Sequence, residues 1–395
     1  MRTEQRFGIL VAVFAGISGC ANPVIPPADP TPGSVPPIET SEPAVVEVMP
    51  SEPARPDPAT IRLTIAAAGD MMLGTDFPEN RLPDDDANDF LTEVAPYFAS
   101  ADIAFGNLEG VLLDGGEPAK QCSNPRACYL FRSPTRYAAH FAGAGFDVMS
   151  LANNHARDFG EAGRDSTMRA LESHGIRHSG REGDIASWEV NGLRVALIAF
   201  AVTRNSFSML DITDAAFEVA DLSREHDLVL VSFHGGAEGL DALHIPFADE
   251  TYYNEPRGDV VAFSRAMVDA GADAVIGHGP HVVRAIERYK DRLIAYSLGN
   301  FATYYGISVA GLKGVAPILE ITIDGNGKFI EGRLIATHQL RPSGPTLDPA
   351  RRAIQEVQRL SRMDFGTPGV RIDDDGTLTP VSRPTVRAAQ AESLD

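Results

Sequence analysis

The chain has 395 residues, of which 44% are hydrophobic, so it is long enough for one large domain or two ordinary ones with a sizeable core. Its formal net charge of -20 excludes a nucleic-acid-binding protein held by phosphate contacts, and it excludes adhesion to an anionic membrane through basic patches. An anionic substrate is compatible with this charge only where local cations outweigh the global field.

The amino terminus has the pattern of a targeting segment. Two arginines precede an apolar run over residues 7–17, which is too short to span a bilayer. Small residues and then Cys20 follow, and this order resembles a bacterial lipoprotein signal that is cut before an acylated cysteine. We therefore predict a lipoprotein signal peptide over residues 1–19 and lipidation of Cys20, with an ordinary secretory signal as the alternative. Because Ala21 is not an aspartate, we expect anchoring in the cell envelope, at the outer membrane or the periplasmic face.

Three segments are expected after the signal peptide. Residues 20–58 are rich in Pro, Ser, Thr and Glu and poor in large apolar side chains, so they form an extended, disordered tether. Residues 59–345 carry the regular patterns of strands and helices and form the folded domain. Residues 346–395 contain a helix followed by a loose tail.

Two cysteines, Cys122 and Cys128, remain in the exported part of the chain. They lie close together in one predicted loop, and an export context is oxidising, so a disulfide between them is the natural expectation. Two free thiols are the alternative. The pair is too isolated for a zinc knuckle, which needs further cysteines or histidines nearby.

In the first half of the folded part, predicted strands and helices alternate, which is typical of parallel βαβ units. Ser133 is expected to cap the second of these helices, with Pro134 at its first position. Buried strands are expected over residues 61–68, 101–105 and 145–149, and helices over residues 90–98, 134–143 and 163–174.

In the second half, hairpins join the pattern. The dipeptide Asn191-Gly192 is the strongest hairpin signal and separates two predicted strands. The other elements expected here are strands over 227–232 and 273–276, helices over 257–270 and 347–360, and hairpins over 287–297 and 317–336. The mixture predicts two sheets packed together and flanked by helices, a four-layer α/β/β/α sandwich.

Five predicted strand ends carry residues of the types that ligate metals. They are Asp70, Glu109, Asn154 with His155, His234, and His278 with His281. Each alone is better explained as a turn residue, a cap or a structural histidine. Together they indicate a site, because ligands of α/β proteins bind at the carboxyl ends of strands.

Carboxylate, amide and imidazole groups together suit one or two divalent ions such as Mn, Fe or Zn. The predicted ligands are Asp70, Glu109, Asn154, His234, His278 and His281. His155 stands beside the proposed amide ligand and is the predicted general acid. Asn107, Glu238 and Asn300 are expected to contact the substrate. The chain contains neither a G-x-S-x-G nucleophile motif nor a phosphate-binding P-loop motif.

Six motifs occur in a recognisable order. They are GDMM at 69–72, GNLEG at 106–110, LANNH at 151–155, SFHGG before Glu238, GHGPHV at 277–282 and YSLGNF at 296–301. As a set they resemble the CapA family, the poly-gamma-glutamate capsule-synthesis (PGA_cap) group of the calcineurin-like metallophosphoesterase superfamily. The resemblance spans about residues 61–340. It implies the four-layer α/β/β/α fold of metallo-dependent phosphatases, membrane anchoring, and a role in making, exporting or attaching an anionic polymer.

The resemblance also implies roles for single residues. Asp70, Asn154, His234 and the pair His278 and His281 match the metal ligands of the superfamily, and His155 matches its general acid. Four positions depart from the usual pattern. Met72 replaces a second ligand histidine, Glu109 stands near the place of a bridging aspartate, Gly235 replaces an aromatic residue, and the final histidines are spaced H-x-x-H. These departures leave open whether one ion, two or none is bound.

Three functions are compatible with these features. The first is a lipid-anchored protein of exopolymer biosynthesis or export, whose metal-dependent hydrolase site acts on an anionic polymer or a phosphoester. The second is a non-catalytic scaffold that binds the polymer or a membrane synthase complex. The third is a secreted metallophosphoesterase without a polymer role. None of the three involves nucleic acid.

Overall fold

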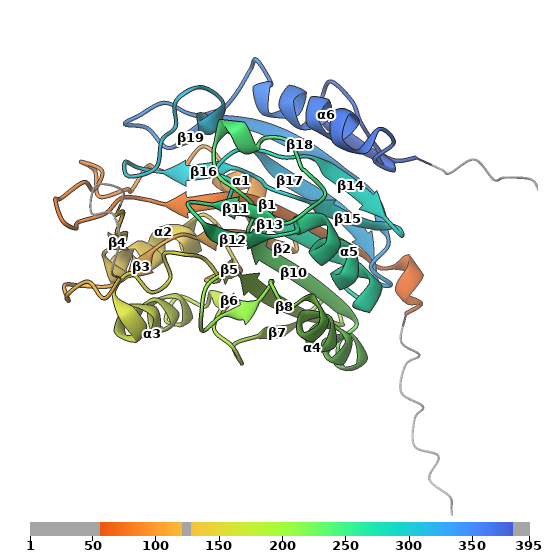
Figure 1. Cartoon of the computed structure of the whole chain (residues 1–395), viewed down its shortest axis with the longest axis horizontal. Helices are drawn as coiled ribbons and strands as arrows, with labels where there is room; N and C mark the ends of the chain where they lie inside the picture. The colour runs from red at the N-terminus through yellow and green to blue at the C-terminus, as the bar shows by residue number, and fades with distance from the viewer. Residues whose placement is uncertain (1–55, 121–127, 382–395) are drawn as a thin grey trace, which may run out of the picture. The chain divides into compact units, whose positions relative to one another are not determined.

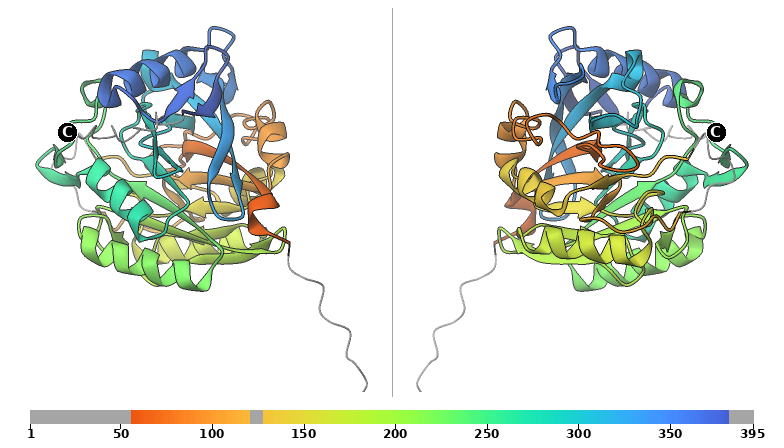
Figure 2. Two further views of the ribbon diagram at one scale, coloured as in Figure 1. Left: turned by 90° about the vertical axis from the view of Figure 1, so that its right-hand side faces the viewer. Right: turned by 90° about the vertical axis from the view of Figure 1, so that its left-hand side faces the viewer.

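Two large β-sheets pack against each other at the centre of the protein, and helices cover their outer sides (Figure 1). The computed structural model describes residues 56–120 and 128–381. Two further views show the same layers from the sides (Figure 2). The predicted α/β/β/α sandwich is therefore confirmed.

The first sheet has ten strands, in the order β20-β21-β18-β17-β1-β2-β5-β6, with β16 beside β1 and β19 beside β18. The strands are β1 (Arg62–Met72), β2 (Ile103–Leu108), β5 (Val148–Ser150), β6 (Arg177–Ser179), β16 (Asn300–Thr303), β17 (Val315–Asp324), β18 (Phe329–Gln339), β19 (Pro345–Leu347), β20 (Val370–Ile372) and β21 (Thr377–Pro380). The strands β1, β2, β5, β6 and β16 are parallel, as expected for βαβ units, whereas the β17–β18 hairpin is antiparallel. The helices of this half are α1 (Ala95–Ala99), α2 (Ala138–Gly143) and α3 (Gly160–Glu172).

The second sheet has seven strands, in the order β14-β15-β13-β10-β8-β7, with β9 beside β8. The strands are β7 (Ala186–Val190), β8 (Leu193–Ala201), β9 (Phe207–Ser208), β10 (Leu228–His234), β13 (Ala274–His278), β14 (Ile286–Tyr289) and β15 (Arg292–Ala295). The predicted hairpin turn at Asn191-Gly192 joins β7 to β8, and both residues have the positive φ that such a turn requires. The helices α4 (Ile212–Glu225) and α5 (Val260–Ala270) pack on this sheet, and Gly271 ends α5 as predicted.

Strand β1 shows how the core is divided between the layers. Leu63, Ile65 and Ala67 belong to the cluster shared with the second sheet, whereas Ala66 and Ala68 belong to the cluster that contains the helices α1 and α2. This alternation follows from the two-residue period of a strand. Residues 65–68 of β1 are buried on both faces, which explains why this stretch is an uninterrupted apolar run in the sequence.

Some predicted elements differ from the structure. Residues 84–94 form turns, so the helix expected over 90–98 is only the short α1. Ser133 does not cap a helix, because its hydroxyl donates to the carbonyl of Gly74 and a 3-10 turn precedes α2. Helix α6 (Arg352–Phe365) lies later in the chain than the helix expected over 347–360, and it buries one face, including Val357 and Leu360. The strands β20 and β21 after it extend the first sheet, and the sequence pattern did not predict them.

Several predictions concern residues outside the described segments. The signal peptide, Cys20, most of the tether and residues 382–395 belong to this group, and so does Cys122 of the expected disulfide. These interpretations stay predictions. Within residues 56–120 and 128–381, no helix has the length and apolar character needed to cross a bilayer.

A buried ion pair holds together the long excursion between β10 and α5, which includes β11 (Glu250–Tyr252) and β12 (Glu255–Gly258). Arg284 has no exposed side-chain surface, and its two terminal nitrogens donate to the Glu250 carboxylate at 2.8 and 2.7 Å. Its Nε also donates to the carbonyl of Ala242 at 2.7 Å. The pair therefore joins this excursion to the segment that follows β13.

We expect Arg284→Met to lower the free energy of unfolding by about 3 to 5 kcal/mol, because the change leaves Glu250 as a buried carboxylate without its cation. Urea denaturation measures the loss. The matched control is Arg333→Met, which removes a cation that is 52% exposed and paired with Glu320, and it should cost less than about 1 kcal/mol. Equal losses for the two variants would contradict the role of the buried pair.

Candidate metal centre

The two sheets bring their strand ends together at one place. Asp70 in β1 lies in register with Asn107 of β2 on one side and Asn300 of β16 on the other. His234 and His278 are the last residues of β10 and β13 and lie opposite each other in the second sheet. Ligand-type side chains from both sheets are thus placed at the carboxyl ends of parallel strands.

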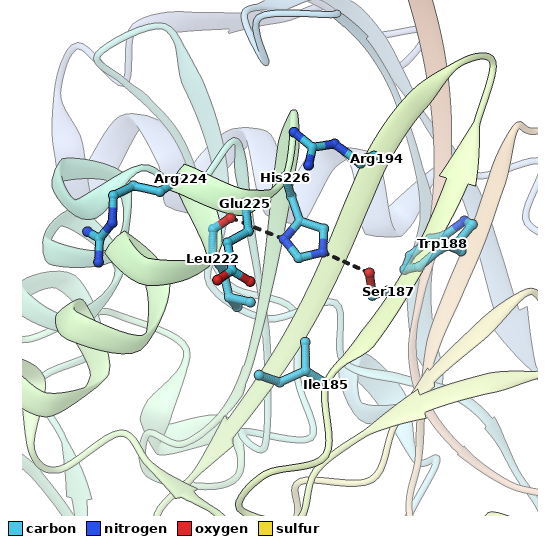
Figure 3. A pocket seen from close by; sticks show the side chains of 8 residues that line it. All are labelled: Ile185, Ser187, Trp188, Arg194, Leu222, Arg224, Glu225 and His226. Atoms are coloured by element: carbon cyan, nitrogen blue, oxygen red, sulfur yellow. Dashed lines mark hydrogen bonds between the residues drawn. The ribbon is translucent and has the colours of Figure 1, made fainter. Parts of the chain in front are cut away.

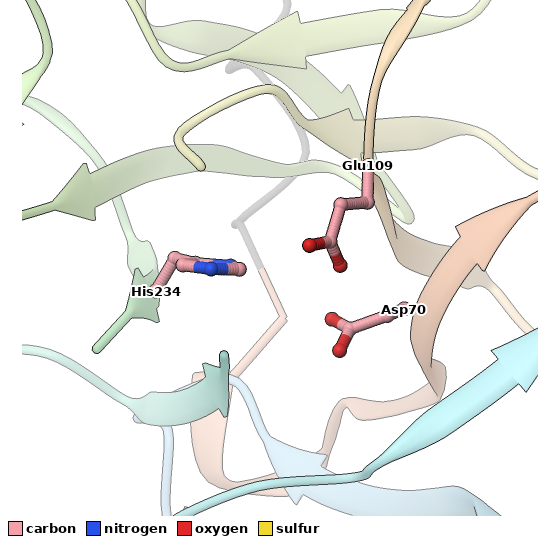
Figure 4. A group of neighbouring side chains, drawn as sticks. All are labelled: Asp70, Glu109 and His234. Carbon is pink, nitrogen blue, oxygen red and sulfur yellow. The ribbon is translucent and has the colours of Figure 1, made fainter. Parts of the chain in front are cut away.

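Three of these side chains point toward one another (Figure 4). One potential ligand atom from each of Asp70, Glu109 and His234 lies within 4.8 Å of the other two, and all three residues are buried. Both carboxylate oxygens of Glu109 and both ring nitrogens of His234 lack a hydrogen-bond partner. Unpaired polar atoms are costly to bury, and a bound cation satisfies them. The donor set therefore fits a divalent metal ion.

His278 and His281 complete the surroundings of Asp70. Nδ1 of His278 lies 3.5 Å from Oδ1 of Asp70, and neither ring nitrogen of His278 has a hydrogen-bond partner. Nδ1 of His281 lies 3.0 Å from Oδ2 of Asp70, and its Nε2 lies 3.5 Å from Oε1 of Glu109. The imidazole of His281 thus stands between the two carboxylates, where it partly compensates their charge.

Burial and neighbouring groups shift the pKa values of the cluster in different directions. Burial raises the pKa of Asp70, but the contacts with His278 and His281 outweigh it and hold that pKa below its usual range. Burial raises the pKa of Glu109 well above its usual range, and the charge of Asp70 adds to the effect. Burial lowers the pKa of His234, so this imidazole is neutral at neutral pH, the form that ligates metals.

His155 is oriented by residues on three sides. Its Nδ1 lies 2.7 Å from Oδ2 of the buried Asp158, and its ring stacks on Phe131 with centroids 4.1 Å apart. The ammonium of Lys120 lies 3.0 Å from Oδ1 of Asp158 and 3.4 Å from Nδ1 of His155. Because the contact with Asp158 is the shorter one at Nδ1, we assign the Nδ1 proton to it, which leaves Nε2 as the reactive nitrogen. Burial lowers the pKa of His155, although the charge of Asp158 opposes this.

The expectation that Asn107 and Asn300 contact substrate is not supported by their placement. The amide of Asn107 is buried between Asp70, to which it donates at 2.9 Å, and Asn153, from which it accepts at 3.2 Å. The oxygen of Asn300 lies 2.9 Å from Nδ1 of His281, and its nitrogen donates to three backbone carbonyls. Both side chains instead contact predicted ligands, Asp70 and His281. Asn153 contacts the predicted acid His155, because its side-chain oxygen accepts from the backbone N–H of that residue at 3.0 Å.

The remaining predicted residues line a cleft of about 870 Å³ beside this cluster. Asn154, His155, Glu238 and His281 all contribute to its wall. The Oδ1 atom of Asn154 is buried without a partner, as expected for a ligand. Glu238, which the sequence predicts to contact substrate, accepts from Arg257 at 2.7 Å and lines the cleft.

A second hollow of about 750 Å³ lies at the amino ends of β8 and β10, away from these strand ends (Figure 3). One ring nitrogen of His226 in this hollow hydrogen-bonds the hydroxyl of Ser187 at 2.7 Å, and the other hydrogen-bonds the carbonyl of Leu222 at 3.1 Å. Among the described residues, no group of three potential metal ligands lies there. We therefore place the candidate site at the cleft.

The structure explains two of the departures from the superfamily pattern. Met72 packs in a small apolar cluster with Phe131 and Ile307, so that position offers no ligand. A β-carbon at Gly235 would lie 2.3 Å from Sδ of Met209, so no aromatic side chain fits there. Asp158 was not predicted, although its place three residues after His155 is a signal that sequence reasoning can use.

A two-sheet sandwich with carboxylates and imidazoles clustered at the carboxyl ends of its strands defines the class of metallo-dependent phosphatase folds. Within this class, the chain matches the family model described as bacterial capsule synthesis protein PGA_cap over residues 64–305, more than half of its length. The protein belongs to that family, and the prediction made from its six motifs is confirmed.

Curated relatives agree with the family. The chain is 30% identical over 262 residues to "Capsule biosynthesis protein CapA" of Bacillus anthracis, covering 61% of this chain and 59% of that protein. It is 28% identical over 336 residues to "PGA biosynthesis protein CapA" of Bacillus subtilis, covering 80% and 82%. A "Probable polyglutamine synthesis accessory protein" of Mycobacterium tuberculosis is 27% identical over 301 residues, covering 67% and 70%.

Solved structures are more distant. A hypothetical protein from Thermus thermophilus has a TM-score of 0.43 at 16% identity, covering 71% of this chain and 100% of that one. A calcineurin-like phosphoesterase from Bacillus subtilis has a TM-score of 0.36 at 12% identity, covering 78% and 98%.

We expect the purified chain to bind Mn²⁺ or Zn²⁺ and to melt at a higher temperature when either ion is added, because the ion relieves the buried unpaired ligands. His234→Ala and Asp70→Asn should weaken metal binding by more than about 10-fold, since even the loss of an outer partner costs that much. Calorimetric titration measures the affinity.

His226→Ala is the matched control, because this histidine is engaged by Ser187 and Leu222 at the far end of the strands. It should bind metal as the unchanged chain does. A chain that binds no divalent ion, or a His234→Ala variant with unchanged affinity, would refute the candidate centre.

Proposed function

We propose that this protein is a divalent-metal-dependent hydrolase of the phosphoesterase type that acts in the biosynthesis or export of an anionic exopolymer. Lipid on Cys20 would place it in the cell envelope. The observation that carries the enzymatic part is the set of buried ligand atoms of Glu109, His234 and His278 that lack partners around Asp70. The polymer part is supported by family membership and by relatives whose names refer to capsule, PGA or polyglutamine synthesis.

The cluster would hold the ion through Asp70, Glu109 and His234, with the two later histidines beside it. A bound divalent cation supplies Lewis-acid chemistry, since it stabilises negative charge that develops on oxygen and makes water more acidic. The substrate would occupy the cleft, whose wall includes His155.

The residues of the chain supply the proton chemistry. Asp158 and Phe131 fix the ring of His155, so its Nε2 is held at the cleft and can donate a proton to a leaving oxygen. Burial keeps the pKa of His155 below its usual value, which makes the protonated ring a stronger acid. Asp158 stabilises the protonated form and sets the tautomer.

A non-catalytic polymer-binding or synthase scaffold is the second candidate. The observation that favours it is Met72, which packs in an apolar cluster at a position where many phosphoesterases have a ligand histidine. A plain secreted phosphoesterase is the third candidate, and family membership argues against it. Deletion of the gene should alter the surface polymer under the first two functions and leave it unchanged under the third.

We expect the Mn²⁺-loaded chain to hydrolyse bis(p-nitrophenyl) phosphate. On methyl phenyl phosphate, whose leaving oxygen is more basic, His155→Ala should lower kcat by about 100-fold or more, because that oxygen loses its acid. Asp158→Asn should lower kcat with little change in KM, because the imidazole loses its orientation and not its place in the cleft. Both variants should retain their metal.

His174→Ala is the control for these kinetics, because His174 hydrogen-bonds Ser173 and the carbonyl of Ala170 at the end of α3, outside the cleft. Its kcat should equal that of the unchanged chain. Absence of turnover by a metal-loaded chain would refute the hydrolase function and support the scaffold function.

A further inference from the structure

Tyrosines gather in the wall of the cleft. Three of the nine tyrosines of the chain, Tyr129, Tyr252 and Tyr253, line it, and we call these three side chains the tyrosine wall. Tyr129 is 54% exposed and Tyr253 is 77% exposed. Each ring has a large apolar face, and covering that face with a flat partner is favourable. The proposed metal ligation and proton chemistry use none of these rings.

Two of these tyrosines belong to the hairpin of β11 and β12 (Figure 1). Tyr252 pairs with Glu255, so Tyr253 and Asn254 form a two-residue turn, and their φ angles are positive, 48° and 65°. Gly, Asn and Asp are favoured at both positions of such a turn, because a bulky side chain is strained at positive φ. Asn254 fits this preference and Tyr253 does not. Strain of this kind is concentrated at functional sites, so the turn alone does not account for the tyrosine.

Both strands of this hairpin are fixed to the rest of the protein. In β11, the carboxylate of Glu250 accepts from the buried Arg284 at 2.7 Å. In β12, Arg257 is buried, and its guanidinium carbon lies 5.3 Å from the ring centroid of Tyr252. A two-stranded hairpin is only marginally stable by itself, so these contacts hold the turn and the side chain of Tyr253 in place. A ring that is held in advance loses little freedom when a ligand binds.

A series of contacts connects the tyrosine wall with the metal cluster. The rings of Tyr253 and Tyr252 meet edge to face, with their centroids 4.4 Å apart. Arg257, which lies over Tyr252, donates to Oε1 of Glu238 at 2.7 Å. The other oxygen of Glu238 lies 4.0 Å from Nε2 of His281. A ligand with an acidic group at the cluster and a ring a few bonds away can therefore contact both regions of the cleft.

The chemistry of the tyrosine wall indicates which group it takes. Tyrosine rings stack on the apolar faces of other rings, and their hydroxyls form hydrogen bonds at the edge. Sugar rings and aromatic rings both have such a face. A linear chain of glutamyl residues has no ring, so it leaves the tyrosine wall without a stacking partner.

We propose that the tyrosine wall is a ring-binding subsite, which takes a sugar ring or an aromatic ring attached to the acidic group at the metal cluster. The site then prefers a ring-bearing phosphoester to an acidic chain without rings. This inference rests on the proposed function, because it assigns a further part of the substrate of the same site.

The test is a calorimetric titration of the Mn²⁺-loaded chain with phosphonates, whose carbon–phosphorus bond resists hydrolysis. Benzylphosphonate and phenylbutylphosphonate carry a ring at different distances from the acidic group, and methylphosphonate and butylphosphonate are their ring-free counterparts. At least one ring-bearing ligand should bind about 10-fold more tightly than its counterpart, because its ring buries apolar surface against the tyrosine wall.

The kind of ring is distinguished by cyclohexylmethylphosphonate. If this ligand binds more weakly than benzylphosphonate, the subsite takes an aromatic ring. If the two bind equally, and both more tightly than methylphosphonate, it takes a saturated ring such as a sugar.

Tyr253→Asn separates a binding role from a structural one. This variant should bring the affinities for ring-bearing and ring-free ligands within about 2-fold of each other, because the stacking face is lost. Its affinity for methylphosphonate should be unchanged. It should melt at the same temperature as the unchanged chain or higher, because Asn is favoured in this turn.

Two controls accompany this variant. Tyr253→Phe should keep the preference for ring-bearing ligands, because the ring remains. Phe217→Ala should keep it as well, since Phe217 is 66% exposed on α4 and does not line the cleft. Equal affinities for every ring-bearing ligand and its counterpart, or a preference that Tyr253→Asn retains, would overturn the proposal.

The outcomes separate this inference from the proposed function. A preference for rings that Tyr253→Asn removes, in a chain that hydrolyses nothing, upholds the subsite and refutes the hydrolase. Hydrolysis of bis(p-nitrophenyl) phosphate by a chain that shows no preference for rings upholds the hydrolase and refutes the subsite.

Discussion

Negative charge buried where the two sheets meet is the constraint on which the site depends. Asp70 and Glu109 have almost no exposed surface, and their carboxylates lie beside imidazoles and not beside water. Burial raises the pKa of Glu109 well above its usual range, whereas the contacts with His278 and His281 hold that of Asp70 below its usual range in spite of burial. His281 compensates part of this charge, and a divalent cation would compensate the rest.

Hydrogen bonds and close packing around the cluster hold its carboxylates in place although the two groups repel each other. The amide of Asn107 contacts Asp70 and that of Asn300 contacts His281, so these two predicted ligands are each held by a neutral neighbour, and Asn153 in turn donates to Asn107. At Gly69 a β-carbon would lie 2.0 Å from the carbonyl oxygen of Gly299, so only glycine lets β1 approach that segment so closely. On the other side of the cleft, the buried pair of Arg284 with Glu250 fixes the excursion that carries Glu238. Positioning therefore depends on residues that touch neither substrate nor metal.

The same architecture separates two regions in space. The buried cluster gathers carboxylates and imidazoles, whereas the cleft beside it has Glu238, Arg257 and Lys313 in its wall. Asn154 and His155 belong to the boundary between them, since both line the cleft and follow β5 closely in the chain.

The sequence by itself determined most of the central strands, the hairpin at Asn191-Gly192 and the family, because the period of apolar residues and the motifs at strand ends are local properties. It did not reveal that residues 90–94 form turns or that β20 and β21 extend the first sheet, because those outcomes depend on partners distant in the chain. It also could not separate contact residues from supporting ones. Asn107 and Glu238 occur in equally suggestive motifs, yet only the packing of the sheets decides that the first is buried behind Asp70 and the second faces the cleft. The reason is physical, since the role of a polar side chain depends on which atoms from the other sheet reach it.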